Sequence, residues 1–162
     1  MVAADEAGVI RVEPWTTRLY WENAMDERQK ELVEKTKRTA ELYFSGLPGE
    51  RPFELWRSFD KDLARDLSLH ITGALYAREK IPHRTRQLVA VAGLTALEKI
   101  DELRMHIWAA LNVGCTKEEI AEVIFQMSTY AGMPAVNSAL RAFKEVLELR
   151  EQAGSGGAGN RP

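Results

Sequence analysis

Cysteine is almost absent from this chain, and its scarcity excludes several kinds of site. Cys115 is the one cysteine among the 162 residues, so no internal disulfide, CxxC redox pair or multi-cysteine metal site can form. The three histidines, His70, His83 and His106, are scattered without an HxH or HExxH pattern. We therefore expect no metal ion in the protein.

A strong charge of either sign and a long hydrophobic run are also missing. The formal net charge is -2, which creates no basic field for nucleic acid or for an anionic membrane. The longest nearly apolar run, Leu88 to Leu97, has about half the length that a bilayer crossing needs. Residues 1–14 show no basic start followed by an apolar stretch, so no secretory signal is expected. The sequence favours a cytoplasmic protein whose partner is a small molecule.

The two ends of the chain differ from its middle. Residues 1–25 contain Trp15, Tyr20 and Trp21 without clear periodicity, which indicates an N-terminal arm that packs on something, such as a neighbouring subunit. Residues 153–162 are rich in glycine and small side chains and are predicted to be disordered. Residues 26–152 form the remaining domain, and a composition of 45% hydrophobic residues allows it a real core.

Helical periodicity runs through this middle region, and alternating valine-rich segments are absent. The pattern predicts an all-α fold of about six helices. The first four cover residues 26–43, 53–77, 84–97 and 101–113, the fifth begins at residue 116, and the last follows Pro134. One apolar stripe, of Leu55, Phe59, Leu63, Leu67, Ile71 and Leu75, follows the second helix. The third is apolar nearly all round and is predicted to be central and fully buried. Thr116 and Glu119 form a capping box, while Gly114 and Gly132 mark breaks.

Residues 81–97 and 102–147 resemble the carboxymuconolactone decarboxylase family. The matching motifs, in order, are Arg86, Glu102-Leu103-x-x-His106, Ala110-Leu111-Asn112-x-Gly114, Glu119-x-x-Glu122 and Tyr130-Ala131-Gly132-x-Pro134. The resemblance implies an alkylhydroperoxidase D-like helical subunit that assembles into a homo-oligomer, either a trimer or a hexamer. It also implies an enzyme without a cofactor.

The redox relatives within this superfamily use two cysteines and a histidine on one helix, with a partner glutamate. The positions that match the cysteines hold Lys99 and Glu102, and the position that matches the glutamate holds Gln87. The equipment of a peroxidase is therefore missing. This departure favours the decarboxylase branch, which acts in the catabolism of aromatic compounds.

Glu102 and His106 are the predicted catalytic pair. They lie four residues apart on one helix, so their side chains share a face and can hydrogen-bond. A carboxylate beside an imidazole raises the pKa of the imidazole toward neutrality or above, which suits a general acid. The resemblance places the histidine of the family at His106 as well. A surface Glu–His pair without function is the alternative.

Four further residues are predicted to bind the substrate. Arg86 can grip a carboxylate with two parallel hydrogen bonds, although a structural cap or an intersubunit ion pair is an equal alternative. Tyr130 could donate to an oxyanion or be a structural tyrosine tied to the backbone. Glu122 could enter the site at a subunit contact, and Trp108 could wall the pocket or pack in the core.

The function that these predictions favour is decarboxylation of a γ-carboxymuconolactone-like unsaturated lactone acid. Loss of carbon dioxide leaves electrons that delocalise onto the lactone carbonyl, so the substrate is its own electron sink and no cofactor is required. Two alternatives stay open. One is a recruited family member that catalyses proton transfer, lactone opening or isomerisation in a secondary pathway, and the other is a catalytically silent oligomeric binding protein.

Overall fold

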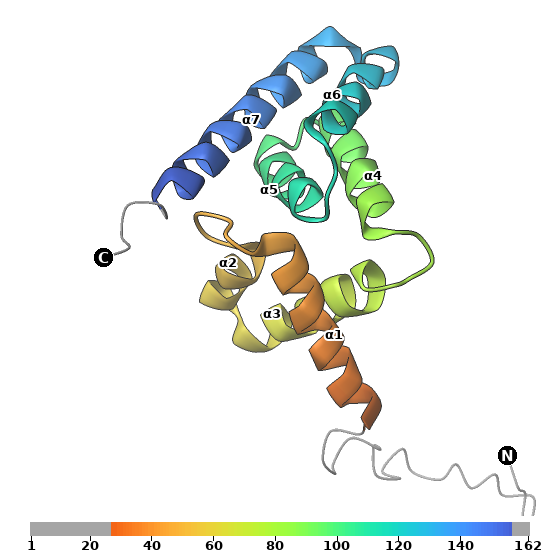
Figure 1. Cartoon of the computed structure of the whole chain (residues 1–162). Coiled ribbons are helices and arrows are strands. Elements are labelled where there is room, and N and C mark those ends of the chain that lie inside the picture. Colours follow the sequence, from red (N-terminus) through yellow and green to blue (C-terminus); the bar gives the residue numbers. More distant parts are fainter. Residues whose placement is uncertain (1–26, 157–162) are drawn as a thin grey trace, which may run out of the picture. The chain divides into compact units, whose positions relative to one another are not determined.

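The computed structural model describes residues 27–156, and every regular element in that range is a helix (Figure 1). Residues 32–156 belong to one compact unit, which contains α1 (Glu27–Phe44) from Leu32 on and every later helix. The all-α class is confirmed. The expected arm of residues 1–25 lies outside the described residues, as do residues 157–162 of the expected tail. The helix α7 (Ser128–Gly156) continues past residue 152, where the tail was expected to begin.

The single helix expected over residues 53–77 is wrong, because the structure divides it into three. These are α2 (Pro52–Phe59), α3 (Lys61–Ser68) and the π-helix η1 (Leu69–Tyr76). Asp60 causes the first break: its backbone is extended, and its carboxylate accepts hydrogen bonds from the amides of Asp62 and Leu63. Aspartate competes with the helix in this way and begins a new one.

The break also changes which side chains are buried. The apolar stripe expected along one helix does not form a continuous core contact, since Phe59 is 86% exposed and Leu63 is 55% exposed. Further along, η1 packs closely on α1. A Cβ atom added at the buried Gly73 would collide with Thr36 Oγ1 and would lie 2.9 Å from Leu32 Cδ1. This close approach fixes the position of η1, which ends at Tyr76.

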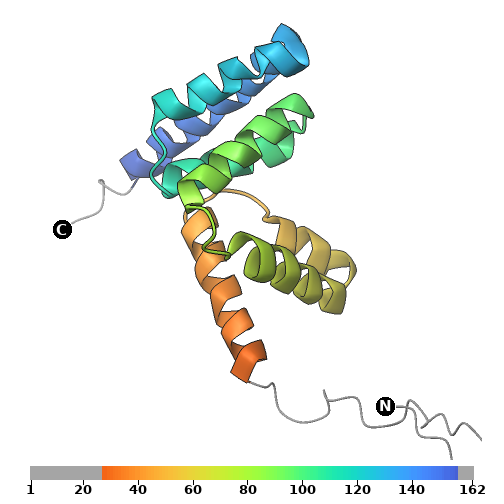
Figure 2. The same ribbon diagram turned by 90° about the vertical axis from the view of Figure 1, so that its right-hand side faces the viewer.

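The main core lies among α4 (His83–Ala96), α5 (Ile100–Asn112), α6 (Lys117–Gln126) and α7, which contact one another (Figure 2). Its fully buried apolar residues include Val91, Leu103, Ile107, Ala110, Ile120, Ile124, Val136 and Ala139. The capping box of Thr116 and Glu119 is confirmed, with both of its hydrogen bonds present. Gly114 and Gly132 both adopt a positive φ, and Gly132 kinks α7.

The prediction that α4 is buried all round is wrong for this chain. Only Gln87, Val91 and Thr95 are buried, and they follow one stripe at a spacing of four residues. Val89 is 63% exposed, and Leu97, just after the helix, is 67% exposed. The partners α5, α6 and α7 therefore cover one side of α4 and leave another side open.

The end of α1 is tied to α5 by polar contacts. The Trp108 indole donates to the carbonyl of Ser45 at 3.0 Å, and the Asn112 side chain donates to the carbonyls of Tyr43 and Ser45. Arg150 from α7 lies 4.6 Å above the Trp108 ring and donates to Asn112 Oδ1 at 2.8 Å. These contacts fix the position of Tyr43.

No helix within residues 27–156 has the length and apolar character needed to cross a membrane.

The contact at Gly73 predicts a measurable effect on stability. We expect Gly73→Ala to lower the free energy of unfolding by about 1–3 kcal/mol, because overpacking outweighs the better helix propensity of alanine. Gly93→Ala in α4 is the matched control, since a Cβ there meets nothing within 4 Å. It should stabilise the protein by up to about 1 kcal/mol. Urea denaturation of both variants gives the comparison, and a neutral or stabilising Gly73→Ala would contradict the packing described.

Candidate functional site

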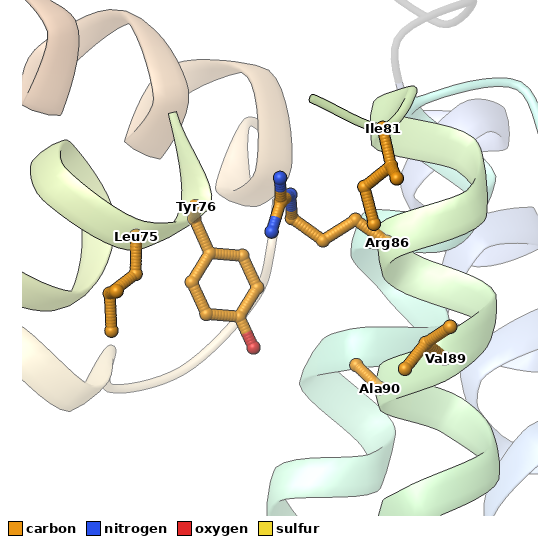
Figure 3. A pocket seen from close by; sticks show the side chains of 6 residues that line it. All are labelled: Leu75, Tyr76, Ile81, Arg86, Val89 and Ala90. Atoms are coloured by element: carbon orange, nitrogen blue, oxygen red, sulfur yellow. The ribbon is translucent and has the colours of Figure 1, made fainter. Parts of the chain in front are cut away.

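A pocket of about 240 Å³ lies between the end of η1 and the face of α4 (Figure 3). Its walls are almost entirely hydrocarbon and consist of Leu75, Tyr76, Ile81, Arg86, Val89 and Ala90. Arg86 is the one charged residue in this lining, and Figure 3 shows its side chain reaching from α4 toward the ring of Tyr76. A single cation in apolar surroundings is a suitable site for one carboxylate of a small ligand.

Arg86 is held in place, and no acidic residue between positions 27 and 156 forms an ion pair with it. Its Nη2 donates to the carbonyl of Arg78 at 2.8 Å, which fixes one end of the guanidinium. Its Nε is buried and has no hydrogen-bond partner in the described part of the chain. A buried donor without a partner is costly, so a ligand that accepts from it gains free energy. The predicted anchor therefore does lie in a pocket.

Tyr76 connects this pocket to His106. The two rings stack with their centroids 5.9 Å apart and their planes 29° apart. Tyr43 packs its edge against Tyr76 at 5.7 Å. Burial raises the pKa of both tyrosines, while the charge of Arg86 acts in the opposite direction on each. Both phenols are therefore protonated at neutral pH.

The environment of His106 differs from the one expected. Its Nδ1 contacts Gln87 Oε1 at 2.9 Å, and no hydrogen bond to Glu102 is formed. An amide oxygen only accepts, so Nδ1 must donate, and Nε2 keeps its lone pair. Burial lowers the pKa of His106 from 6.5 to about 4, and the charge of the exposed Glu102 offsets this only in part. The expected pKa at or above neutrality is therefore wrong, because desolvation outweighs a carboxylate that stays in solvent.

A second pair of polar residues lies behind Tyr76 and was not among the predicted site residues. The Tyr43 hydroxyl and His83 Nδ1 are 2.6 Å apart, and their rings meet edge to face at 5.3 Å. Tyr43 and Tyr76 precede the segment of family resemblance, so no motif indicates them. Gln87 was considered only as the residue that replaces the glutamate of the redox relatives. No spacing signal in the sequence connects positions 43, 76, 87 and 106.

The other predicted binding residues do not line the pocket. Trp108 is 4% exposed, and its indole is used in the contact with Ser45. Tyr130 is 75% exposed next to the kink in α7, and Glu122 is exposed on α6. Arg86 lines the pocket with Tyr76, the ring of Tyr76 stacks on His106, and Glu102 acts on His106 through its charge. Contact of Trp108, Tyr130 and Glu122 with a substrate stays a prediction.

Two further residues, Cys115 and Arg84, make contacts that are structural. The Cys115 thiol is buried, and burial raises its pKa, so the helix that follows does not activate it. Arg84 forms an ion pair with Glu119 of the capping box. Within residues 27–156 no group of three or more histidine, cysteine or acidic side chains is arranged to hold a metal ion.

The protein is all-helical, with Arg86 in an apolar pocket and the half-buried imidazole of His106 stacked on Tyr76 of that pocket. The chain belongs to the carboxymuconolactone decarboxylase family, whose model matches residues 61–145. It is 41% identical over 98 residues to the 4-carboxymuconolactone decarboxylase of Acinetobacter baylyi, which covers 60% of this chain and 73% of that protein. An uncharacterised 15.0 kDa protein of Paracoccus denitrificans, from the nqo9-nqo10 intergenic region, is 41% identical over 76 residues, or 46% of this chain and 57% of that protein.

The geometry of His106 predicts its titration. The ¹⁵N shifts of its ring at pH 7 should report a neutral imidazole with the proton on Nδ1, and the pKa should be about 4. Since the unfolded chain binds this proton below pH 6.5, stability should fall as the pH drops from 6.5 to 4, by roughly 3 kcal/mol at most from this group.

The matched variant for this titration is Gln87→Leu, which removes the acceptor and should abolish the preference for the Nδ1 proton. The signal that disappears in His106→Gln identifies the ring. A wild-type pKa above 6.5 would contradict the account of burial.

Proposed function

We propose that this protein is a cofactor-free decarboxylase that acts on a γ-carboxymuconolactone-like unsaturated lactone acid in the breakdown of aromatic compounds. Membership of the family and the name of the Acinetobacter relative support the class of reaction. The observation that carries the proposal is the position of Arg86, which is the charged member of an apolar pocket whose Tyr76 stacks on His106. A group that binds an anion and a group that carries a proton thus lie next to one small cavity.

This reaction requires little of the protein because the substrate can hold the electrons. The bond between the ring carbon and its carboxylate breaks, carbon dioxide leaves, and the electron pair moves through the double bond onto the lactone carbonyl oxygen. One proton then adds to a ring carbon, and the carbonyl forms again. The site has to anchor a carboxylate, stabilise the oxyanion and supply that proton.

Arg86 is the proposed anchor for the carboxylate that the substrate keeps. Its Nε has no hydrogen-bond partner within residues 27–156, so the guanidinium has a donor left for a carboxylate. The carboxylate that leaves then lies against hydrocarbon, such as Ile81 and Val89. A charge that disappears as neutral carbon dioxide is easier to lose from apolar surroundings than from water.

His106 is the proposed proton carrier, with Glu102 as a weaker electrostatic partner. In the free protein the imidazole is neutral, because its pKa is about 4. A substrate that brings two carboxylates close to the ring raises this pKa, since an anion stabilises the imidazolium. We propose that His106 takes up a proton when the substrate binds and gives it to carbon after carbon dioxide leaves. The Gln87 amide keeps the ring oriented throughout.

One observation favours a second candidate function. The Nε2 lone pair of a neutral imidazole is a base, and a base suits proton transfer or isomerisation of an unsaturated lactone better than it suits acid catalysis. The recruited family member considered from the sequence would use His106 in this way. Release of carbon dioxide from the lactone acid separates the two functions, because isomerisation retains every carbon.

We further propose that the chain forms a trimer or hexamer. Large apolar side chains without cover support this, among them Phe59, Tyr130, Leu97 and Val89, which are 86%, 75%, 67% and 63% exposed. Sedimentation equilibrium at micromolar concentration should then give a mass of three or six chains of 18.3 kDa. A mass of one chain would contradict the proposal.

The role of Arg86 predicts a graded response to substitution. Arg86→Gln should raise KM for the lactone acid by about 10- to 100-fold, the loss of a charge-assisted contact of about 1.5–3 kcal/mol. The KM of Arg86→Lys should lie between those of the wild type and Arg86→Gln, because lysine keeps the charge but loses the two parallel donors. Carbon dioxide release measures the activity.

Arg141→Gln, on an exposed position of α7, is the control and should match the wild type. If wild-type protein releases no carbon dioxide from the lactone acid, the proposed reaction is wrong. If Arg86→Gln keeps the wild-type KM, the anchor is wrong.

A further inference from the structure

Tyr76 contacts both the pocket and His106. It is the last residue of η1, it lines the pocket opposite Arg86, and its ring stacks on the imidazole. Figure 3 shows its hydroxyl group directed into the space between η1 and α4. π-Helices are rare and often occur at functional positions, which fits a segment that presents one side chain to a ligand.

The ring of Tyr76 is held on two sides. His106 stacks at 5.9 Å, and Tyr43 meets it edge to face at 5.7 Å with an interplanar angle of 81°. Three residues earlier, Gly73 allows η1 to pack on Thr36 and Leu32 of α1, which fixes the backbone that leads to Tyr76. The hydroxyl therefore has a defined direction before any ligand arrives, and a donor arranged in advance stabilises charge most effectively.

The hydroxyl of Tyr76 forms no hydrogen bond with another of residues 27–156, and the side chain is half-buried. The two other candidate phenols are unsuitable. Tyr43 is 1% exposed, and its hydroxyl already pairs with His83. Tyr130 is 75% exposed outside the pocket lining. Burial raises the pKa of Tyr76, so the group remains a proton donor at neutral pH.

We infer that Tyr76 is a catalytic residue that donates a hydrogen bond to the oxyanion formed on the carbonyl oxygen attached to the ring of the ligand, while Arg86 holds the carboxylate. The inference rests on the proposed function for the identity of that oxygen, the lactone carbonyl. No covalent bond to Tyr76 forms, and its proton stays on the phenol oxygen. The hydrogen bond strengthens as the electron pair arrives, so it stabilises the transition state more than the bound substrate.

The kinetic test is Tyr76→Phe, which keeps the ring and its stacking on His106. We expect kcat to fall about 10²-fold, as for removal of one oxyanion donor, with KM changed less than about threefold. Ser58→Ala, which removes an exposed hydroxyl on α2, is the control and should leave both constants unchanged. A structural role would instead show as a lower midpoint of urea denaturation. Wild-type kcat in Tyr76→Phe would overturn the inference.

A binding test separates this inference from the proposed reaction. The probe is 4-hydroxy-3-nitrobenzoate at a pH where its phenol is ionised, because it presents a carboxylate and a ring oxyanion together, and 3-nitrobenzoate lacks the oxyanion. Calorimetry should show the wild type binding the first at least 10-fold more tightly and Tyr76→Phe binding both equally. This result supports Tyr76 as the donor to the oxyanion even if the protein decarboxylates no lactone acid. An unchanged preference in Tyr76→Phe, or no preference in the wild type, would overturn it.

Discussion

Burial of the His106 imidazole against the Gln87 amide is the constraint on which the site depends. Desolvation lowers the pKa of His106 to about 4, and the amide oxygen of Gln87 keeps its one proton on Nδ1. The ring is therefore uncharged, oriented and able to stack on Tyr76 without placing a cation beside Arg86. A permanently charged imidazolium would instead repel the guanidinium that the pocket requires for anion binding.

The scaffold maintains this arrangement through contacts far apart in the sequence. Trp108 and Asn112 of α5 bind the carbonyls at the end of α1, and this places Tyr43 against Tyr76. The same α5 carries His106 two residues before Trp108, so one rigid helix positions both the imidazole and the contacts that hold its neighbours. Gly73 helps to fix the position of Tyr76, because it allows η1 to pack on α1.

The sequence predicted the all-helical class, the family and the capping box of Thr116, because these depend on local periodicity or on residue matches. The roles of Arg86 and His106 in the site stay predictions. Prediction from the sequence failed for properties that depend on tertiary contacts. The pKa of His106 depends on burial, and the spacing to Glu102 carries no information about burial. Asp60 interrupts an apolar stripe that reads as one helix, and Tyr76 acquires its position only through a π-helix that hydrophobic spacing does not reveal.

The central claim is that the imidazole is neutral until an anionic ligand binds and then accepts a proton. Calorimetric titration at pH 7 with a saturated lactone diacid, which cannot lose carbon dioxide by the proposed route, tests it in buffers of different ionisation enthalpy. The account predicts uptake of close to one proton per site in the wild type and none in His106→Gln. Binding of the diacid without proton uptake by the wild type would contradict it.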